Sequence, residues 1–144
     1  MITDVGLTHV ALMVSDLDRS LAFYDRYCAM RPVHQRAARG GRVAWISDLT
    51  RPFVVVLIEG DLSSEARLGP LGHLGVGCES RARVDELTAI AAAEGCLRLG
   101  PIDSPPPVGY WAYLDDPDGH TVELTHGQEV GLTVLEHIAP AQAG

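Results

Sequence analysis

One pattern occurs twice along the 144 residues, and it limits the folds open to the chain more than any other feature. Each half begins with a strand-like segment, continues with a helix-like segment and then shows further strand-like segments, in the order βαβββ. The first copy is expected at residues 5–60 and the second at 72–127, with a linker at 61–71 and a C-terminal tail at 128–144. A chain of this kind forms one α+β domain made of two modules.

The two copies keep the same spacing at two independent points. His9 in the first opening strand and His73 at the start of the second lie 73 − 9 = 64 residues apart. Asp16 or Asp18 is expected to cap the first helix and Ser80 the second, and positions 16 and 80 also differ by 64. The spacing therefore predicts that each module opens with a strand that carries a histidine.

The stretch DPDGH at 116–120 sets the strand register in the second module. Proline suits the first position of a turn and glycine the left-handed third, so a three-residue hairpin loop is predicted here. This register places Tyr113 opposite Glu123 on the neighbouring strand.

Composition excludes several classes of function. The net charge is −8 and the basic residues are scattered, so a nucleic-acid partner is not expected. All eleven basic residues are arginines, which excludes lysine-based Schiff-base chemistry. No apolar run approaches the roughly 18 residues that a membrane span needs. The N-terminus lacks the features of a secretory signal, so we expect a cytoplasmic protein.

Glu123 is unusual because it stands in the middle of an apolar strand pattern. Equivalent opening strands of two modules would meet near a pseudo-two-fold axis, where Glu123 would join His9 and His73. Two imidazoles and one carboxylate form a facial triad that holds a divalent cation and leaves positions open for substrate, water or dioxygen. A cation would also compensate the cost of burying the carboxylate.

At this point the sequence resembles the vicinal oxygen chelate superfamily, which includes glyoxalase I, extradiol ring-cleaving dioxygenases, and bleomycin and fosfomycin resistance proteins. The resemblance covers residues 7 to about 126. Three stretches carry it: THVALMVSDLDRSLAFY at 8–24, GHLGVGC at 72–78 and YLDDPDGHTVELTH at 113–126. It implies two paired βαβββ modules that form a cupped, half-barrel mixed sheet around a metal site.

The resemblance also implies roles for individual residues. It puts His9, His73 and Glu123 at metal-ligand positions, for one divalent ion per site (Fe²⁺, Mn²⁺, Zn²⁺ or Ni²⁺). Several members carry a functional tyrosine ten residues before the glutamate, which here is Tyr113. A phenol at this place would hydrogen-bond a substrate oxygen or transfer a proton.

A fourth ligand or further catalytic group is an open alternative at Glu59. Equal spacing matches Glu59 to Glu123, because 59 − 9 and 123 − 73 are both 50. Matching the terminal glycines Gly60 and Gly127 instead puts Val56 opposite Glu123, and Glu59 then faces the other side of its strand.

Three functions remain open from the sequence. The first is a metal-dependent, extradiol dioxygenase-like enzyme whose small substrate chelates the metal through vicinal oxygens. The second is a glyoxalase-type lyase or isomerase, and the third is a bleomycin-resistance-type protein that binds a drug without catalysis. A homodimer is expected, with modules pairing within or between chains.

Overall fold

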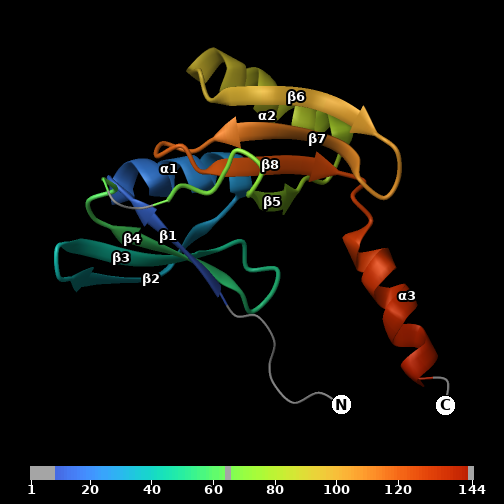
Figure 1. Cartoon of the computed structure of the whole chain (residues 1–144), viewed down its shortest axis with the longest axis horizontal. Coiled ribbons are helices and arrows are strands. Elements are labelled where there is room, and N and C mark those ends of the chain that lie inside the picture. The colour runs from blue at the N-terminus through green and yellow to red at the C-terminus, as the bar shows by residue number, and fades with distance from the viewer. Residues whose placement is uncertain (1–8, 64–65, 143–144) are drawn as a thin grey trace. The chain divides into compact units, whose positions relative to one another are not determined.

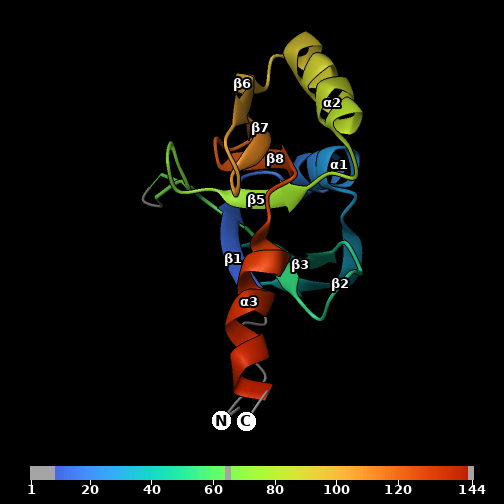
Figure 2. The same cartoon turned by 90° about the vertical axis from the view of Figure 1, so that its right-hand side faces the viewer.

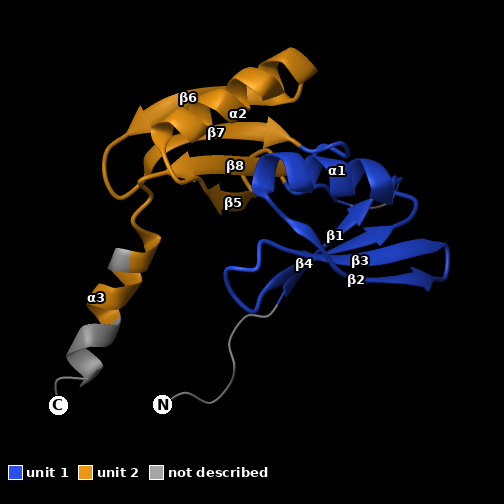
Figure 3. Ribbon diagram, turned by 180° about the vertical axis from the view of Figure 1, so that it is seen from behind, with its two compact units in different colours: residues 1–68, 116–120 blue, residues 69–115, 121–144 orange. Residues whose placement is uncertain are grey.

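The computed structural model describes residues 9–63 and 66–142, which divide into two compact units (Figure 3). Unit 1 comprises residues 1–68 and 116–120, and unit 2 comprises residues 69–115 and 121–144. Each unit holds one four-stranded mixed sheet and a helix that packs on it. The predicted α+β class and the repeated βαβββ order are therefore confirmed.

Unit 1 forms its sheet from strands in the order β1-β4-β3-β2 (Figure 1). Asp16 is the N-cap of the helix, where its carboxylate accepts a hydrogen bond from the Arg19 N–H, and Ala29 ends the helix in the left-handed conformation. The buried face of α1 packs on β2, β3 and β4. The elements are β1 (His9–Val14), α1 (Leu17–Cys28), β2 (Arg31–Ala38), β3 (Gly41–Ser47) and β4 (Val54–Glu59).

Unit 2 repeats this arrangement with the strand order β5-β8-β7-β6. Ser80 caps α2, Gly95 ends it, and the helix packs along β6, β7 and β8 (Figure 2). Because side chains alternate along a strand, Leu124 faces the helix side while Glu123 faces the other side of the sheet. The elements are β5 (Leu74–Gly77), α2 (Arg81–Glu94), β6 (Leu97–Ser104), β7 (Gly109–Asp115) and β8 (Thr121–His126).

The loop at 116–120 joins two strands of unit 2 but packs within unit 1. The buried Tyr24 hydroxyl donates to Asp116 at 2.9 Å, and the Ser15 N–H donates to Asp118 at 3.1 Å. Burial, and then the neighbouring Asp116 carboxylate, raise the pKa of Tyr24 far above its usual range, so its phenol stays protonated. The predicted hairpin pairing is also present, since the Asp116 N–H donates to the His120 carbonyl at 2.9 Å.

The C-terminal segment after β8 contains a helix. Residues Val130–Gln142 form α3, which leaves the end of β8 and points away from the sheet of unit 2 (Figure 1). Val130 and Leu135 are each 59% exposed, so this helix presents apolar side chains to solvent. None of the helices in the described ranges is long and apolar enough to cross a membrane.

Candidate metal and substrate site

The candidate site lies on the face of the unit 2 sheet that α2 does not cover. Glu123 occupies the middle of β8, opposite Gly75 of β5 on one side and Tyr113 of β7 on the other. Its side chain is only 7% exposed. A carboxylate this buried is unfavourable unless a hydrogen-bond donor, a positive charge or a metal ion lies beside it.

His73 and Glu123 form a close pair. The His73 Nε2 lies 3.3 Å from the Glu123 Oε2, and the His73 Nδ1 lies 2.7 Å from the Leu71 carbonyl oxygen. Since a carbonyl only accepts hydrogen bonds, Nδ1 carries the proton, and this contact fixes both the tautomer and the direction of the ring. Metal-binding histidines are held in the same manner by an acceptor on their other nitrogen.

Gln128 supplies the other contact of the carboxylate. Its Nε2 donates to the Glu123 Oε1 over 3.3 Å, beyond the usual range for such a bond. The two polar contacts of Glu123 are therefore both long. A buried carboxylate with a directed imidazole beside it and a long hydrogen bond from Gln128 suits a divalent cation.

Tyr113 borders this pair. Its ring centroid lies 5.2 Å from that of His73 and 4.8 Å from that of Trp111. The Arg98 guanidinium lies 5.6 Å from the Tyr113 ring centroid, and it also binds Asp115 at 3.0 Å and the Thr121 hydroxyl at 2.5 Å. No sequence motif points to Arg98, because it is a single arginine at the start of a strand and has no counterpart in the first module.

Open space adjoins the carboxylate over β5. Gly75 and Gly77 pair with Glu123 and Thr125, and no atom lies within 4 Å of the position that a Cβ would take at either glycine. The two glycines therefore leave room for a ligand on this face of the sheet.

His9 lies in unit 1, at the start of β1, and its face of the strand includes Ala11 and Met13. The strand pairing brings Ala11 opposite Val56. Within the described part of the chain, no third histidine, cysteine or carboxylate joins His73 and Glu123 in a cluster. The role of His9 as a third ligand thus stays a prediction.

The pairing of β1 with β4 distinguishes the two alignments proposed for Glu59. Ala11 pairs with Val56 as Gly75 pairs with Glu123, so Val56 is the repeat counterpart of Glu123. Glu59 pairs with Val14 and therefore faces the side of the sheet opposite to His9.

The Glu59 carboxylate has hydrogen-bond and ion-pair partners within unit 1. It accepts the Leu17 N–H at 2.9 Å, at the first turn of α1, and it binds Arg42 at 3.1 Å. Arg42, and then the Leu17 N–H, lower the pKa of Glu59 from 4.5 to about 2. These contacts are those of a helix-capping group.

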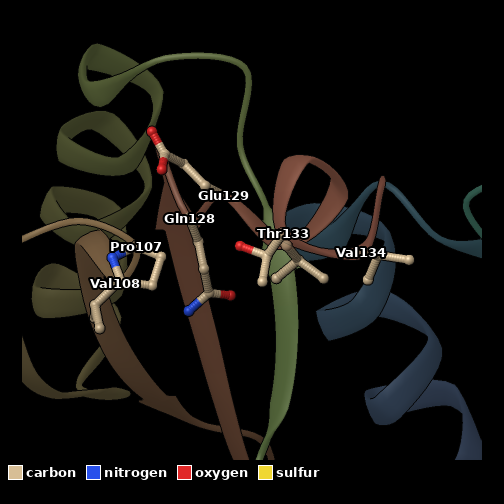
Figure 4. A pocket seen from close by; sticks show the side chains of 7 residues that line it. Pro107, Val108, Gln128, Glu129, Thr133 and Val134 are labelled. Carbon is tan, nitrogen blue, oxygen red and sulfur yellow. The ribbon is translucent and has the colours of Figure 1, made fainter. Parts of the chain in front are cut away.

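A groove of about 380 Å³ lies at the end of β8 in unit 2 (Figure 4). Gln128 lies between Pro107 and Val108 on one side and Thr133 of α3 on the other. Because Gln128 also contacts Glu123, the groove begins one side chain away from the buried carboxylate.

Comparison with known proteins places these features in a family. Residues 6–124 match the model of the glyoxalase/bleomycin resistance protein/dioxygenase superfamily, and the chain belongs to this superfamily. The uncharacterized protein PA2024 of Pseudomonas aeruginosa is 40% identical over 127 residues, which cover 87% of this chain and 91% of that protein.

Two solved structures are similar in fold. The fosfomycin resistance protein FosX of Listeria monocytogenes, in complex with Mn(II) and sulfate, is 26% identical with a TM-score of 0.66, and the match covers 88% of this chain and 92% of FosX. The trypanothione-dependent glyoxalase I of Leishmania major is 22% identical with a TM-score of 0.67, and the match covers 98% and 100% of the two chains. The latter likeness concerns the fold alone.

Proposed function

We propose that the protein is a divalent-metal-dependent enzyme acting on a small substrate that chelates the metal through two neighbouring oxygens. The proposed ligands are His9, His73 and Glu123. The observation that carries the proposal is the buried Glu123 carboxylate, 3.3 Å from an imidazole that a backbone carbonyl directs toward it. The Mn(II) complex of FosX, a member with a similar fold, supports the choice of a divalent ion.

Tyr113 and Arg98 would have separate roles beside the bound cation. A bound cation would act as a Lewis acid toward the two substrate oxygens. Tyr113 would donate to, or exchange a proton with, the substrate beside Glu123. Arg98, held by Asp115 and Thr121, would keep positive charge beside the Tyr113 ring.

Extradiol dioxygenase-like ring cleavage is the first candidate reaction. Val56 is the apolar counterpart of Glu123, and Glu59 points to the other face of its strand, so three protein ligands are proposed rather than four. Two histidines and one carboxylate with open positions are typical of non-haem iron(II) oxygenases. A glyoxalase-type lyase or isomerase is the second candidate, because Tyr113 lies beside the pair as a group able to move a proton.

The experiment compares both reactions on protein purified without a polyhistidine tag. The protein is stripped with a chelator and reloaded separately with Fe²⁺, Mn²⁺, Zn²⁺ or Ni²⁺. Ring cleavage is followed by oxygen uptake with catechols, and glyoxalase activity by loss of the hemithioacetal of methylglyoxal and glutathione. We expect metal-dependent turnover in one assay, lost in Glu123→Gln and kept in the control Glu129→Gln, whose carboxylate lies beyond the end of β8.

Two results would contradict the proposal. One is equal turnover by stripped and reloaded protein. The other is tight binding of bleomycin by stripped protein without turnover in either assay, which would favour the drug-binding class.

A further inference from the structure

Gln128 contacts the buried carboxylate although it lies beyond the end of the strand that carries Glu123. Residues five apart in one extended strand are separated by roughly 17 Å and project to opposite faces. The Gln128 amide nevertheless donates to the Glu123 Oε1 over 3.3 Å. The contact is possible because β8 ends at His126 and Gly127 then turns the chain with a φ of 75°, a value that favours glycine.

The backbone around Gln128 is anchored on two sides. A Cβ at Gly109 of β7 would lie 2.6 Å from the His126 carbonyl oxygen and 2.9 Å from the Gln128 backbone nitrogen, so this close approach needs glycine. The Glu129 N–H donates to the Pro107 carbonyl at 3.0 Å. Gln128 itself is exposed, so burial does not explain the direction of its side chain. The printed contact of its amide is the bond to the carboxylate.

The two oxygens of Glu123 face different partners. Oε1 accepts the hydrogen bond from Gln128, and Oε2 lies 3.3 Å from the His73 Nε2. The His73 Nδ1 carries the proton of the neutral ring, because it faces the Leu71 carbonyl. Nε2 and Oε2 therefore both offer lone pairs to a cation, while the Gln128 bond engages the other oxygen.

We propose that Gln128 is a positioning residue that holds Glu123 so that Oε2 alone binds the metal ion. An amide donor at Oε1 opposes rotation of the carboxylate and keeps this oxygen away from the ion. Hydrogen bonds of this kind orient metal-binding carboxylates, and their loss typically costs roughly 10- to 100-fold in metal affinity. The inference rests on the proposed metal site and assigns a role to a residue outside the three proposed ligands.

The test compares Mn²⁺ binding by wild type, Gln128→Leu, Gln128→Asn and the control Thr133→Val. Leucine removes the amide, whereas asparagine keeps it on a side chain one methylene shorter, which does not reach Glu123. Thr133 lines the same groove as Gln128 and has no proposed role at the metal. Electron paramagnetic resonance measures free Mn²⁺ and records the spectrum of the bound ion. Circular dichroism confirms that each protein is folded.

We expect Gln128→Leu and Gln128→Asn each to weaken Mn²⁺ binding by roughly 10- to 100-fold, and Thr133→Val to bind as wild type does. At saturating Mn²⁺ the spectrum of the bound ion should also change in both Gln128 variants, because a carboxylate that is free to rotate can offer both oxygens to the ion. A purely structural role of Gln128 would leave this spectrum unchanged.

Each contrary outcome overturns a defined statement. Wild-type affinity in either Gln128 variant, an unchanged spectrum of the bound ion in both, or an equal loss in Thr133→Val rejects the role of Gln128 while the metal site stands. Failure of the wild-type protein to bind Mn²⁺ or any other of the four proposed ions rejects the proposed function, and the role of Gln128 with it.

Discussion

A carboxylate in the middle of β8 is the residue that most needs an explanation. Glu123 is buried, and its contacts with His73 and Gln128 are both 3.3 Å long. Isolated buried charge is unfavourable unless it is paired or coordinates a metal. The directed His73 ring and the open space over Gly75 account for its position if a cation and a substrate oxygen share this face.

Replacing Tyr113 by phenylalanine should separate catalysis from metal binding. The phenol borders the His73–Glu123 pair but is not proposed as a ligand. Tyr113→Phe is expected to lower kcat by about 10²-fold or more, as loss of a positioned proton-transfer group does. Metal content, measured on the same samples by mass spectrometry, should not change. Unchanged turnover would assign Tyr113 to packing alone.

Replacing Glu59 by glutamine tests the alternative role of this residue. Its folded-state pKa is lowered from 4.5 to about 2, so its contribution to stability is present above pH 4.5 and is lost as the pH falls through about 2. Glu59→Gln should lower the Tm at pH 7, and the difference from wild type should shrink between pH 4.5 and pH 2. Metal content should stay constant. Loss of metal in this variant would instead place Glu59 among the ligands.

At the scale of elements, local patterns predicted much of the fold. The sequence predicts Asp16 or Asp18 as the cap of α1 and Ser80 as the cap of α2, because short polar side chains accept the first N–H groups of a helix. In the structure Asp16 and Ser80 do so. The register of Tyr113 opposite Glu123 follows from the turn residues of the loop at 116–120. The caps and the register depend on residues that are close together in the sequence, so local patterns predict them.

Other features depend on contacts between distant residues and gave no local signal. The capping of α1 by Glu59 joins residues 42 positions apart. The loop at 116–120 packs with unit 1 through Tyr24, 92 positions from Asp116. Periodicity and turn chemistry do not report such pairs, so Arg98 and the role of Glu59 required the structure.

The cap of α2 offers a quantitative check at this scale. The Ser80 hydroxyl accepts the Arg83 N–H at 3.0 Å. Ser80→Ala should reduce the free energy of unfolding by about 1 kcal/mol, measured by urea denaturation, whereas Ser80→Asp should keep the cap and its stability. Equal stability of all three proteins would contradict the capping role.

At the scale of the whole molecule, we propose a homodimer with two equivalent sites. Each unit has a four-stranded sheet with open edges, and such edges favour further pairing or cover. The proposed ligands come from both units, with His9 in unit 1 and Glu123 in unit 2. Sedimentation at micromolar concentration should give a dimer, and a monomer would contradict it.

A mixing experiment tests whether two chains share one site. Inactive His9→Ala and Glu123→Ala proteins are unfolded and refolded together. If the modules pair between chains, mixed dimers regain one complete site, and part of the activity returns. No recovery in a mixture shown to contain heterodimers would assign all three ligands to one chain.

Metal content is the most direct test of the central claim that His9, His73 and Glu123 hold one divalent ion. Protein without a polyhistidine tag is equilibrated with Mn²⁺, Fe²⁺, Zn²⁺ or Ni²⁺, freed of unbound ion, and measured by mass spectrometry beside the triple variant His9→Ala, His73→Ala, Glu123→Ala. Circular dichroism confirms that the variant is folded. The account predicts one ion per wild-type chain and none above background in the variant. Equal metal content in the two proteins would contradict it.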